Sequence, residues 1–326
     1  MAGGVGGLLL QTNSALKREI IPYFSPMLQG LLEVQGEEFL ARVEEIRLRC
    51  GQPLLVKLGD EDWTIIPAGQ ASRSLQLGYR TSEEDIYRCI ASISDNSLYA
   101  FEEDIRRGFI TIPGGHRVGL AGSVITERDE VKNIKYFSGI CFRVARQIPG
   151  AAAGILKEIC DAGNGELVNT LIISPPRCGK TTMLRDLARQ ISSGRGRAAQ
   201  NVVLVDERSE LAGCFRGIPQ LDVGPQTDIL DACPKATGMM MAIRSLSPQV
   251  IICDEIGRQE DYAAVRECIN AGVSVICSVH AGSDDDLRRR PFIRDLLGSG
   301  AFKIGVVLSR SKGPGTIREI IRWDGI

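Results

Sequence analysis

The stretch LVNTLIISPPRCGKTTMLRDLAR, residues 167–189, changes from apolar to polar residues through a short segment of Pro, Gly, Lys and Thr. Its first part is typical of a buried strand and its last part of a helix, so the segment between them connects a strand to a helix. Residues 174–181, Ser-Pro-Pro-Arg-Cys-Gly-Lys-Thr, match the phosphate-loop pattern G-x-x-x-x-G-K-[ST] at every fixed position except the first. The sequence therefore predicts a nucleotide site at the start of this helix.

The residue types of this loop suit a bound triphosphate. A helix N-terminus and inward-facing backbone N–H groups attract anions, and one cationic side chain completes such a site. Gly179 allows a close approach of the backbone, and Lys180 is expected to reach the β and γ phosphates. Thr181 is expected to ligate Mg²⁺, and Thr182 to begin the helix. The residues expected to bind ATP with Mg²⁺ are Ser174, Pro175, Pro176, Arg177, Cys178, Gly179, Lys180, Thr181 and Thr182.

Ser174 stands where the pattern has its first glycine. If that position requires a positive φ, a non-Gly residue costs about 1–2 kcal/mol, which weakens binding without abolishing it. Pro175 and Pro176 can instead set a stiff turn that avoids this strain.

Short apolar runs that end in polar residues recur through the second half of the chain. They are LVNTLIIS (167–174), NVVLVD (201–206), QVIICDE (249–255) and GVSVICSVH (272–280). Such runs, separated by helical segments, indicate an α/β fold with a mostly parallel central sheet covered on both faces. Ligands of such sheets bind beyond the carboxyl ends of the strands, where these polar residues fall. Residues 304–323 predict a closing hairpin.

Two carboxylates follow the third of these runs. We expect Asp254 to hold Mg²⁺, partly through water, and Glu255 to orient or deprotonate the attacking water as a catalytic residue. An apolar run followed by Asp-Glu is a weak signal alone, but it becomes strong downstream of a phosphate loop.

Further polar residues follow the other strands, and each has two readings. Asp206, Glu207 and Glu210 form either a solvated charged loop or a second acidic wall of the nucleotide site. His280 is either a structural residue or a catalytic sensor of the γ-phosphate or of a metal-bound water.

The first half of the chain mixes helices with antiparallel strands. Thr81 and Glu84 have the spacing of a capping box, which predicts a helix start there, and a second helix is expected over 97–107, ending at Gly108. Residues 44–58 and 109–125 predict two hairpins. We expect three segments in all: a disordered lead-in at 1–13, an α+β domain at 14–149 and an ATPase domain at 150–326.

Composition argues against several classes of protein. The 326 residues carry a net charge of −1, so the basic surplus typical of nucleic-acid binders is missing. No apolar run reaches the roughly 18 residues that a membrane-spanning helix needs, and the opening stretch is too short for a secretory signal. The ten cysteines are scattered without a C-x-x-C pair, which favours reduced core cysteines in a cytoplasmic protein.

The order of these motifs resembles the secretion-ATPase branch of the RecA-like superfamily. Members of that branch carry a phosphate loop, an acidic Asp box, a Walker B strand and a His box, which match residues 174–181, 206–210, 250–255 and 278–281. The resemblance implies a RecA-like P-loop NTPase domain preceded by a smaller α+β N-terminal domain. It further implies a homo-hexameric ring.

A narrower resemblance covers about residues 20–320. EEIRLRCGQPL (44–54), VDERSELAGC (205–214) and the long stretch 222–257 are similar to the stage III sporulation protein AA family. That likeness implies a mother-cell ATPase, cytoplasmic and peripheral to the forespore-facing membrane, which energises a channel of membrane-embedded sporulation proteins. Asp254 departs from the Gly of general secretion ATPases, and Gly257-Arg258 from their Arg after Glu-Ile.

Hydrolysis in such a ring requires a cation brought to the γ-phosphate from a neighbouring domain or subunit. An ordinary surface arginine is the alternative reading for each candidate. The candidates are Arg117, Arg143, Arg146 and Arg244.

Two other functions stay open. A nucleotide-binding ring scaffold with little turnover is compatible with Ser174, and a RecA-like motor acting on nucleic acid shares the same core. The neutral charge and the lack of an aromatic-basic stripe disfavour the motor on nucleic acid. A GTPase is disfavoured because the guanine signature N-K-x-D is missing.

Overall fold

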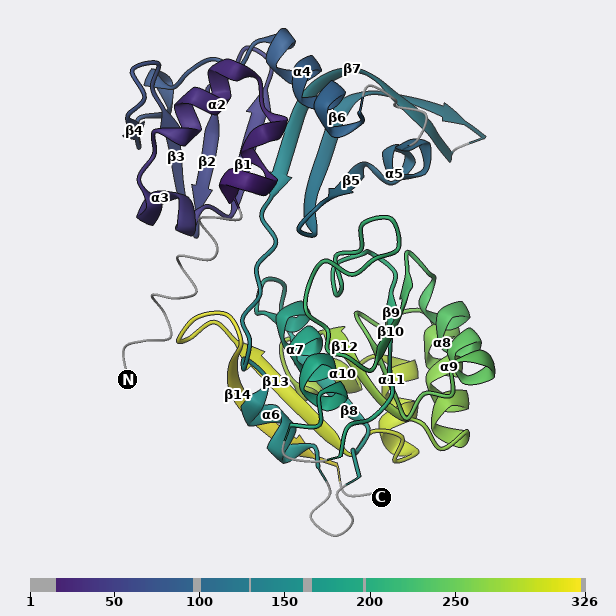
Figure 1. Ribbon diagram of the computed structural model, residues 1–326. Coiled ribbons are helices and arrows are strands. Elements are labelled where there is room, and N and C mark those ends of the chain that lie inside the picture. Colours follow the sequence, from purple (N-terminus) through teal and green to yellow (C-terminus); the bar gives the residue numbers. More distant parts are fainter. Residues whose placement is uncertain (1–15, 96–100, 129, 161–165, 196–197, 324–326) are drawn as a thin grey trace. The chain divides into compact units, whose positions relative to one another are not determined.

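The computed structural model describes residues 16–95, 101–128, 130–160, 166–195 and 198–323 (Figure 1). The chain forms two compact units, and the division falls between Arg146 and Gln147. The expected disordered lead-in at 1–13 lies outside the described residues.

The first unit is built on a seven-stranded sheet whose recorded strand pairs are all antiparallel. The strand order is β4-β3-β2-β1-β7-β6-β5. The strands are β1 (Glu45–Arg49), β2 (Leu55–Leu58), β3 (Glu61–Ile65), β4 (Ala71–Ser72), β5 (Phe109–Ile112), β6 (His116–Glu127) and β7 (Glu130–Arg143). The helices are η1 (Ile21–Tyr23), α2 (Pro26–Glu33), α3 (Glu37–Arg42), η2 (Leu75–Leu77), α4 (Glu83–Ile93) and α5 (Glu102–Arg107).

Alternation of side chains along the strands places the core of this unit. On β1, Ile46 and Leu48 are buried and lie opposite Phe142 and Ile140 of β7. Because successive strand residues point to opposite faces, these apolar side chains line one face of the sheet. They belong to one apolar cluster with the buried leucines of α2. Both predicted hairpins, β1–β2 and β5–β6, are confirmed.

The capping box of α4 lies one residue later than predicted. Ser82, not Thr81, caps the helix: its hydroxyl accepts the N–H of Asp85, and the Asp85 carboxylate accepts the N–H of Ser82. Thr81 is unavailable because its backbone is bonded to the loop at Gly51 and Gln52. Of the helix expected at 97–107, the described part is α5, which ends at Gly108 with φ of 81°.

Asp85 is therefore a candidate for stabilising the first unit. Its carboxylate accepts hydrogen bonds from Ser25, Tyr79 and Ser82. Burial raises the pKa of Asp85, but these hydrogen bonds outweigh burial and lower it overall.

Replacing Asp85 by Ala is expected to lower the free energy of unfolding by about 2 kcal/mol at pH 7 in urea denaturation. A carboxyl whose pKa is depressed in the folded state stabilises above its unfolded pKa, and this gain is lost as the pH falls through the folded pKa. The difference between the variant and wild type should therefore shrink below about pH 4. Glu83→Ala, an exposed acid in the same helical turn, is the matched control, and an equal loss there would contradict the account.

The second unit is a layered α/β structure around a second seven-stranded sheet, ordered β10-β9-β11-β12-β8-β13-β14. Its strands are β8 (Thr170–Ser174), β9 (Val202–Asp206), β10 (Thr227–Asp231), β11 (Val250–Cys253), β12 (Ser274–His280), β13 (Ile304–Ser309) and β14 (Thr316–Arg322). Its helices are α6 (Ala153–Glu158), α7 (Lys180–Ser192), α8 (Lys235–Ser245), α9 (Gln259–Asn270), α10 (Asp284–Arg288) and α11 (Pro291–Gly298). All neighbouring strands are parallel except the terminal β13–β14 pair, so the predicted parallel sheet and closing hairpin are confirmed.

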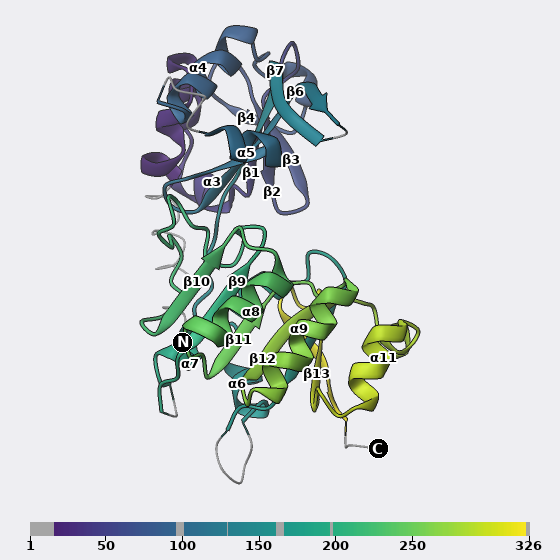
Figure 2. The same cartoon turned by 90° about the vertical axis from the view of Figure 1, so that its right-hand side faces the viewer.

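Helices cover both faces of this sheet. Ile172 belongs to an apolar cluster with Leu187 of α7, whereas the adjacent Ile173 belongs to the opposite cluster with Val265 of α9. Figure 2 shows α8 and α9 together over one face. The strands therefore read as continuous apolar runs, because both of their faces are buried. Among the described residues, no helix is long and apolar enough to cross a membrane.

Candidate nucleotide site

The phosphate loop connects β8 to α7 at the carboxyl edge of the second sheet. The helix begins at Lys180 after Gly179, which has φ of 88°, so the expected start at Thr182 is wrong. The first helical bond runs from the N–H of Met183 to the carbonyl of Gly179, because the left-handed glycine ends the loop there. A Cβ at Gly179 would also lie 2.9 Å from the backbone nitrogen of Gly315. Only glycine fits this position without strain.

Backbone strain falls on a different residue than expected. Ser174 is the last residue of β8 and pairs in register with His280 of β12. Its φ is not positive; the non-glycine residue of the loop with a left-handed backbone is Arg177, at φ of 61°. The missing first glycine therefore carries no left-handed penalty here.

Three residues form a chain of polar contacts beside the loop: Lys180 of α7, His280 at the end of β12, and Glu255 just beyond β11. Lys180 Nζ lies 2.8 Å from His280 Nδ1, and His280 Nε2 lies 2.7 Å from Glu255 Oε1. Lys180 is 7% exposed. Burial lowers the pKa of its ammonium, and the nearby Glu255 carboxylate partly offsets this effect. The structure thus brings together the three residues that the sequence placed at different strand ends.

Glu255 has an unusual backbone. Its φ is 36°, and its N–H donates to the hydroxyl of Ser278 on β12. A left-handed backbone at a non-glycine residue costs energy, and such residues cluster at functional sites. Arg208 Nη1 also lies 3.3 Å from Glu255 Oε2, a contact that sequence reasoning missed.

Asp254, directly before it, offers an oxygen suited to a cation. The residue is 4% exposed, and its Oδ1 has no hydrogen-bond partner among the described residues. Burial, only partly offset by Lys235, raises the pKa of Asp254 to about 7. Mg²⁺ is commonly bound by one or two carboxylates plus substrate phosphates, so this orphaned oxygen and the half-buried Thr181 fit that ion. In the described part of the chain no three His, Cys, Asp or Glu side chains form a complete metal cage.

The acidic residues at and just beyond the end of β9 make different contacts. Asp206 is buried and accepts the N–H groups of Glu210, Leu211 and Ala212, so it holds the following loop. Burial raises the pKa of Asp206 despite these bonds. Asp206 therefore does not serve as a free acidic wall, whereas Glu207 forms an ion pair with the buried Lys235.

The arginine candidates differ in their surroundings. Arg146 Nη2 donates to the carbonyls of Ala41, at 3.0 Å, and Val43, at 2.8 Å, so its guanidinium is occupied within the first unit. Arg117 lies over the ring of Phe109 with 3.8 Å between its Cζ and the ring centroid. Arg143, at the end of β7, and Arg244, in the last turn of α8, are exposed.

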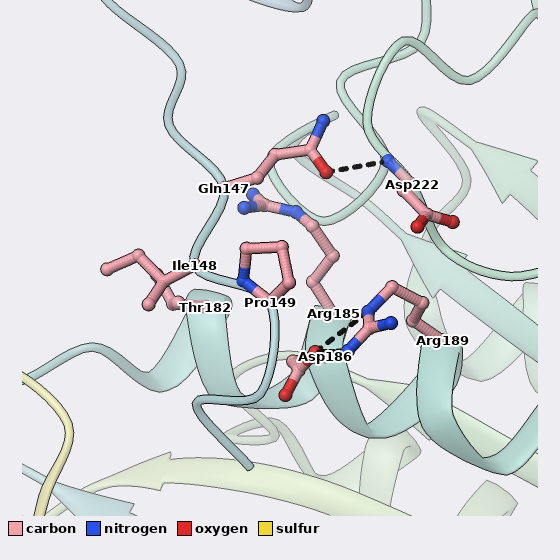
Figure 3. A pocket seen from close by; sticks show the side chains of 8 residues that line it. All are labelled: Gln147, Ile148, Pro149, Thr182, Arg185, Asp186, Arg189 and Asp222. Atoms are coloured by element: carbon pink, nitrogen blue, oxygen red, sulfur yellow. Dashed lines mark hydrogen bonds and ion pairs between the residues drawn. The ribbon is translucent and has the colours of Figure 1, made fainter. Parts of the chain in front are cut away.

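A pocket is lined by residues of α7 and by residues 147–149, the segment that enters the second unit (Figure 3). Its lining residues are Gln147, Ile148, Pro149, Thr182, Arg185, Asp186, Arg189 and Asp222. The Asp186 carboxylate accepts the N–H groups of Gly150 and Ala152 and the guanidinium of Arg189. Gln147 accepts the N–H of Asp222. The entering segment is therefore fastened to the helix that carries the phosphate loop.

Comparison with known families shows to which family the chain belongs. A family model described as sporulation stage III, protein AA, matches residues 15–326. Stage III sporulation protein AA of Bacillus subtilis strain 168 is 44% identical over 308 residues, which cover 94% of each chain. The chain belongs to the stage III sporulation protein AA family. The narrower resemblance drawn from its motifs is thereby confirmed.

Solved structures show how this member of the stage III sporulation protein AA family is folded. The ATPase DotB of Legionella pneumophila aligns with a TM-score of 0.58 at 15% identity, covering 87% of this chain and 76% of DotB. The pilus retraction motor PilT with bound ADP aligns with a TM-score of 0.52 at 14% identity, covering 89% and 77%. The RecA-like P-loop ATPase fold predicted from the sequence is confirmed.

Proposed function

We propose that this chain is a Mg²⁺-dependent ATPase that powers a membrane channel or secretion complex between the mother cell and the forespore during endospore formation. The observation that carries the proposal is the contact chain from Lys180 through His280 to Glu255, directly behind a phosphate loop. A buried cation, an imidazole and a carboxylate at one sheet edge are suited to phosphoryl chemistry. Family membership and the fold of DotB and PilT support the same class of activity.

The residues have distinct proposed roles. The loop N–H groups and Lys180 bind the β and γ phosphates, and Thr181 and Asp254 hold Mg²⁺, the latter partly through water. Mg²⁺, when bound, supplies charge neutralisation for the phosphates. Glu255 orients or deprotonates the attacking water, and His280 senses the γ-phosphate.

The contacts of Lys180 indicate how a bound nucleotide engages this machinery. Lys180 donates to His280 and to the carbonyl of Ser174. A bound triphosphate competes for that ammonium, because hydrogen bonds between two ionised groups are the stronger ones. Lys180 then contacts phosphate in place of His280.

A homo-hexameric ring is proposed from the family resemblance, and within each chain we propose an N-terminal domain at 14–149 and an ATPase domain at 150–326. Arg143 and Arg244 remain the proposed cations from a neighbouring domain or subunit, because both are exposed. Arg146 is a weaker choice, since its guanidinium already donates to two carbonyls. Light scattering in ATP and Mg²⁺ tests the ring, and a monomer would contradict it.

The proposed setting follows the family name of the Bacillus relative. We place the protein in the mother-cell cytoplasm, peripheral to the forespore-facing membrane through membrane-embedded sporulation channel proteins. We expect no nucleic-acid partner, given the net charge of −1.

Phosphate release by the purified chain tests the enzymatic claim. We expect turnover with ATP and Mg²⁺, and its loss when EDTA removes the metal, because the phosphates then lack their counter-charge. Single-stranded DNA is the control for the nucleic-acid motor and should leave the rate unchanged. Tight ATP binding without phosphate release would favour a ring scaffold and defeat the ATPase proposal.

A further inference from the structure

A buried lysine that plays no part in the proposed reaction lies at the same sheet edge. Lys235 is the first residue of α8 and is 7% exposed. Its Nζ donates to the carboxylate of Glu207, just beyond β9. The same atom lies 3.9 Å from Oδ1 of Asp254, just beyond β11. The ammonium therefore stands between two carboxylates that come from different strand ends.

A buried ammonium at this position is energetically unfavourable by itself. The N-terminus of a helix carries partial positive charge, so an ammonium in its first turn is repelled. Burial of a charge is also unfavourable unless oppositely charged partners offset it. The Glu207 carboxylate, which accepts a hydrogen bond from Lys235 Nζ, and the Asp254 carboxylate, 3.9 Å from the same atom, are these partners. Lys235 is thus held as a fixed positive charge by these two carboxylates.

The position of that charge relative to Asp254 is specific. Asp254 Oδ1 lacks a hydrogen-bond partner among the described residues, and the same oxygen lies 3.9 Å from the ammonium. A divalent cation approaching this oxygen meets a like charge a few ångströms away. Like charges at such distances repel strongly at a buried site, where solvent screens them little.

We propose that Lys235 is a positioning residue that acts as the built-in counter-ion of Glu207 and Asp254 and makes divalent-cation binding at Asp254 conditional on the nucleotide. Without nucleotide, the ammonium satisfies the carboxylates and repels the metal. The phosphates of a bound nucleotide add negative charge that offsets this repulsion, so the metal enters with the nucleotide. This inference rests on the proposed metal contact of Asp254, but its main consequence concerns the nucleotide-free protein.

Titration of the nucleotide-free protein with Mn²⁺, followed by the electron paramagnetic resonance signal of the free ion, tests this role. Lys235→Met removes the charge and keeps the length of the side chain, so it should bind Mn²⁺ at least about tenfold more tightly than wild type. Lys235→Arg retains the charge and should behave as wild type. Lys157→Met, at an exposed lysine of α6, is the matched control and should leave Mn²⁺ affinity unchanged.

Two further variants make the result decisive. Asp254→Asn added to Lys235→Met should remove the gained affinity, which locates the ion at Asp254. If Lys235→Met does not fold, Lys235→Gln replaces it, because its amide can still donate to Glu207. A gain below about threefold in the folded neutral variant would overturn the proposal, as would wild-type Mn²⁺ affinity that does not rise when a non-hydrolysable ATP analogue is bound.

Failure of this inference is distinguishable from failure of the proposed function. The variant comparison involves no nucleotide and no turnover, so it decides the role of Lys235 even in a protein that hydrolyses nothing. The converse result is phosphate release by wild-type protein together with unchanged Mn²⁺ affinity in Lys235→Met. That result would support the proposed ATPase activity and contradict the proposed counter-ion role of Lys235.

Discussion

Glu255→Gln is expected to reduce ATP turnover by about 10²–10⁴-fold without weakening the binding of ATP and Mg²⁺. The amide retains the size of the carboxylate but cannot accept the proton of the attacking water. It also removes a negative charge close to where the γ-phosphate is proposed to lie, so affinity should be equal or higher. The measurements are phosphate release for turnover and calorimetry for affinity.

A matched variant separates chemistry from general damage. Glu260→Gln changes an exposed carboxylate at the start of α9, on the element that follows the same strand. It should retain wild-type turnover. Wild-type turnover in Glu255→Gln would remove this residue from the reaction.

Lys180→Met is expected to abolish turnover and to weaken ATP binding by at least about tenfold. The methionine keeps most of the buried volume of the side chain, so the loss reports the ammonium rather than a cavity. His280 and Glu255 also lose the cation that faces them.

Lys157→Met is again the matched control, with wild-type binding and turnover expected. Thermal unfolding of both variants checks that the fold is retained. Undiminished ATP affinity in folded Lys180→Met would show that the nucleotide binds elsewhere.

Much of the fold follows from local sequence patterns. The parallel strands are predictable because burial on both faces requires continuous apolar runs, as in residues 250–253 of β11. β10 was not predicted, since Thr227–Asp231 lies at the sheet edge and carries two aspartates. Its pairing to β9 comes from backbone hydrogen bonds, which leave little trace in side-chain pattern.

The predicted starts of two helices are wrong by one or two residues, because the backbone rather than the side chain sets where these helices begin. Thr81 has the right hydroxyl for a cap, but its backbone is committed to a neighbouring loop, so Ser82 takes the position. The start of α7 was placed too late because the left-handed Gly179, rather than a threonine, ends the loop.

Parts of the candidate site depend on contacts between distant segments. No local motif marks Lys235, since a lysine at a helix start is unremarkable in sequence and its partners follow other strands. The left-handed backbone of Glu255 depends on Ser278 of the neighbouring strand, and the occupied guanidinium of Arg146 depends on carbonyls of α3 and its C-cap. The phosphate loop, by contrast, can be predicted from the sequence because its residues are consecutive.

The central claim is that residues 174–182 bind the triphosphate of ATP together with Mg²⁺. Isothermal titration calorimetry of the wild-type chain with ATP in Mg²⁺ tests it most directly. We expect a saturable heat that fits one site per chain and is lost in Lys180→Met. Absence of binding heat in the folded wild-type protein across several temperatures would contradict it.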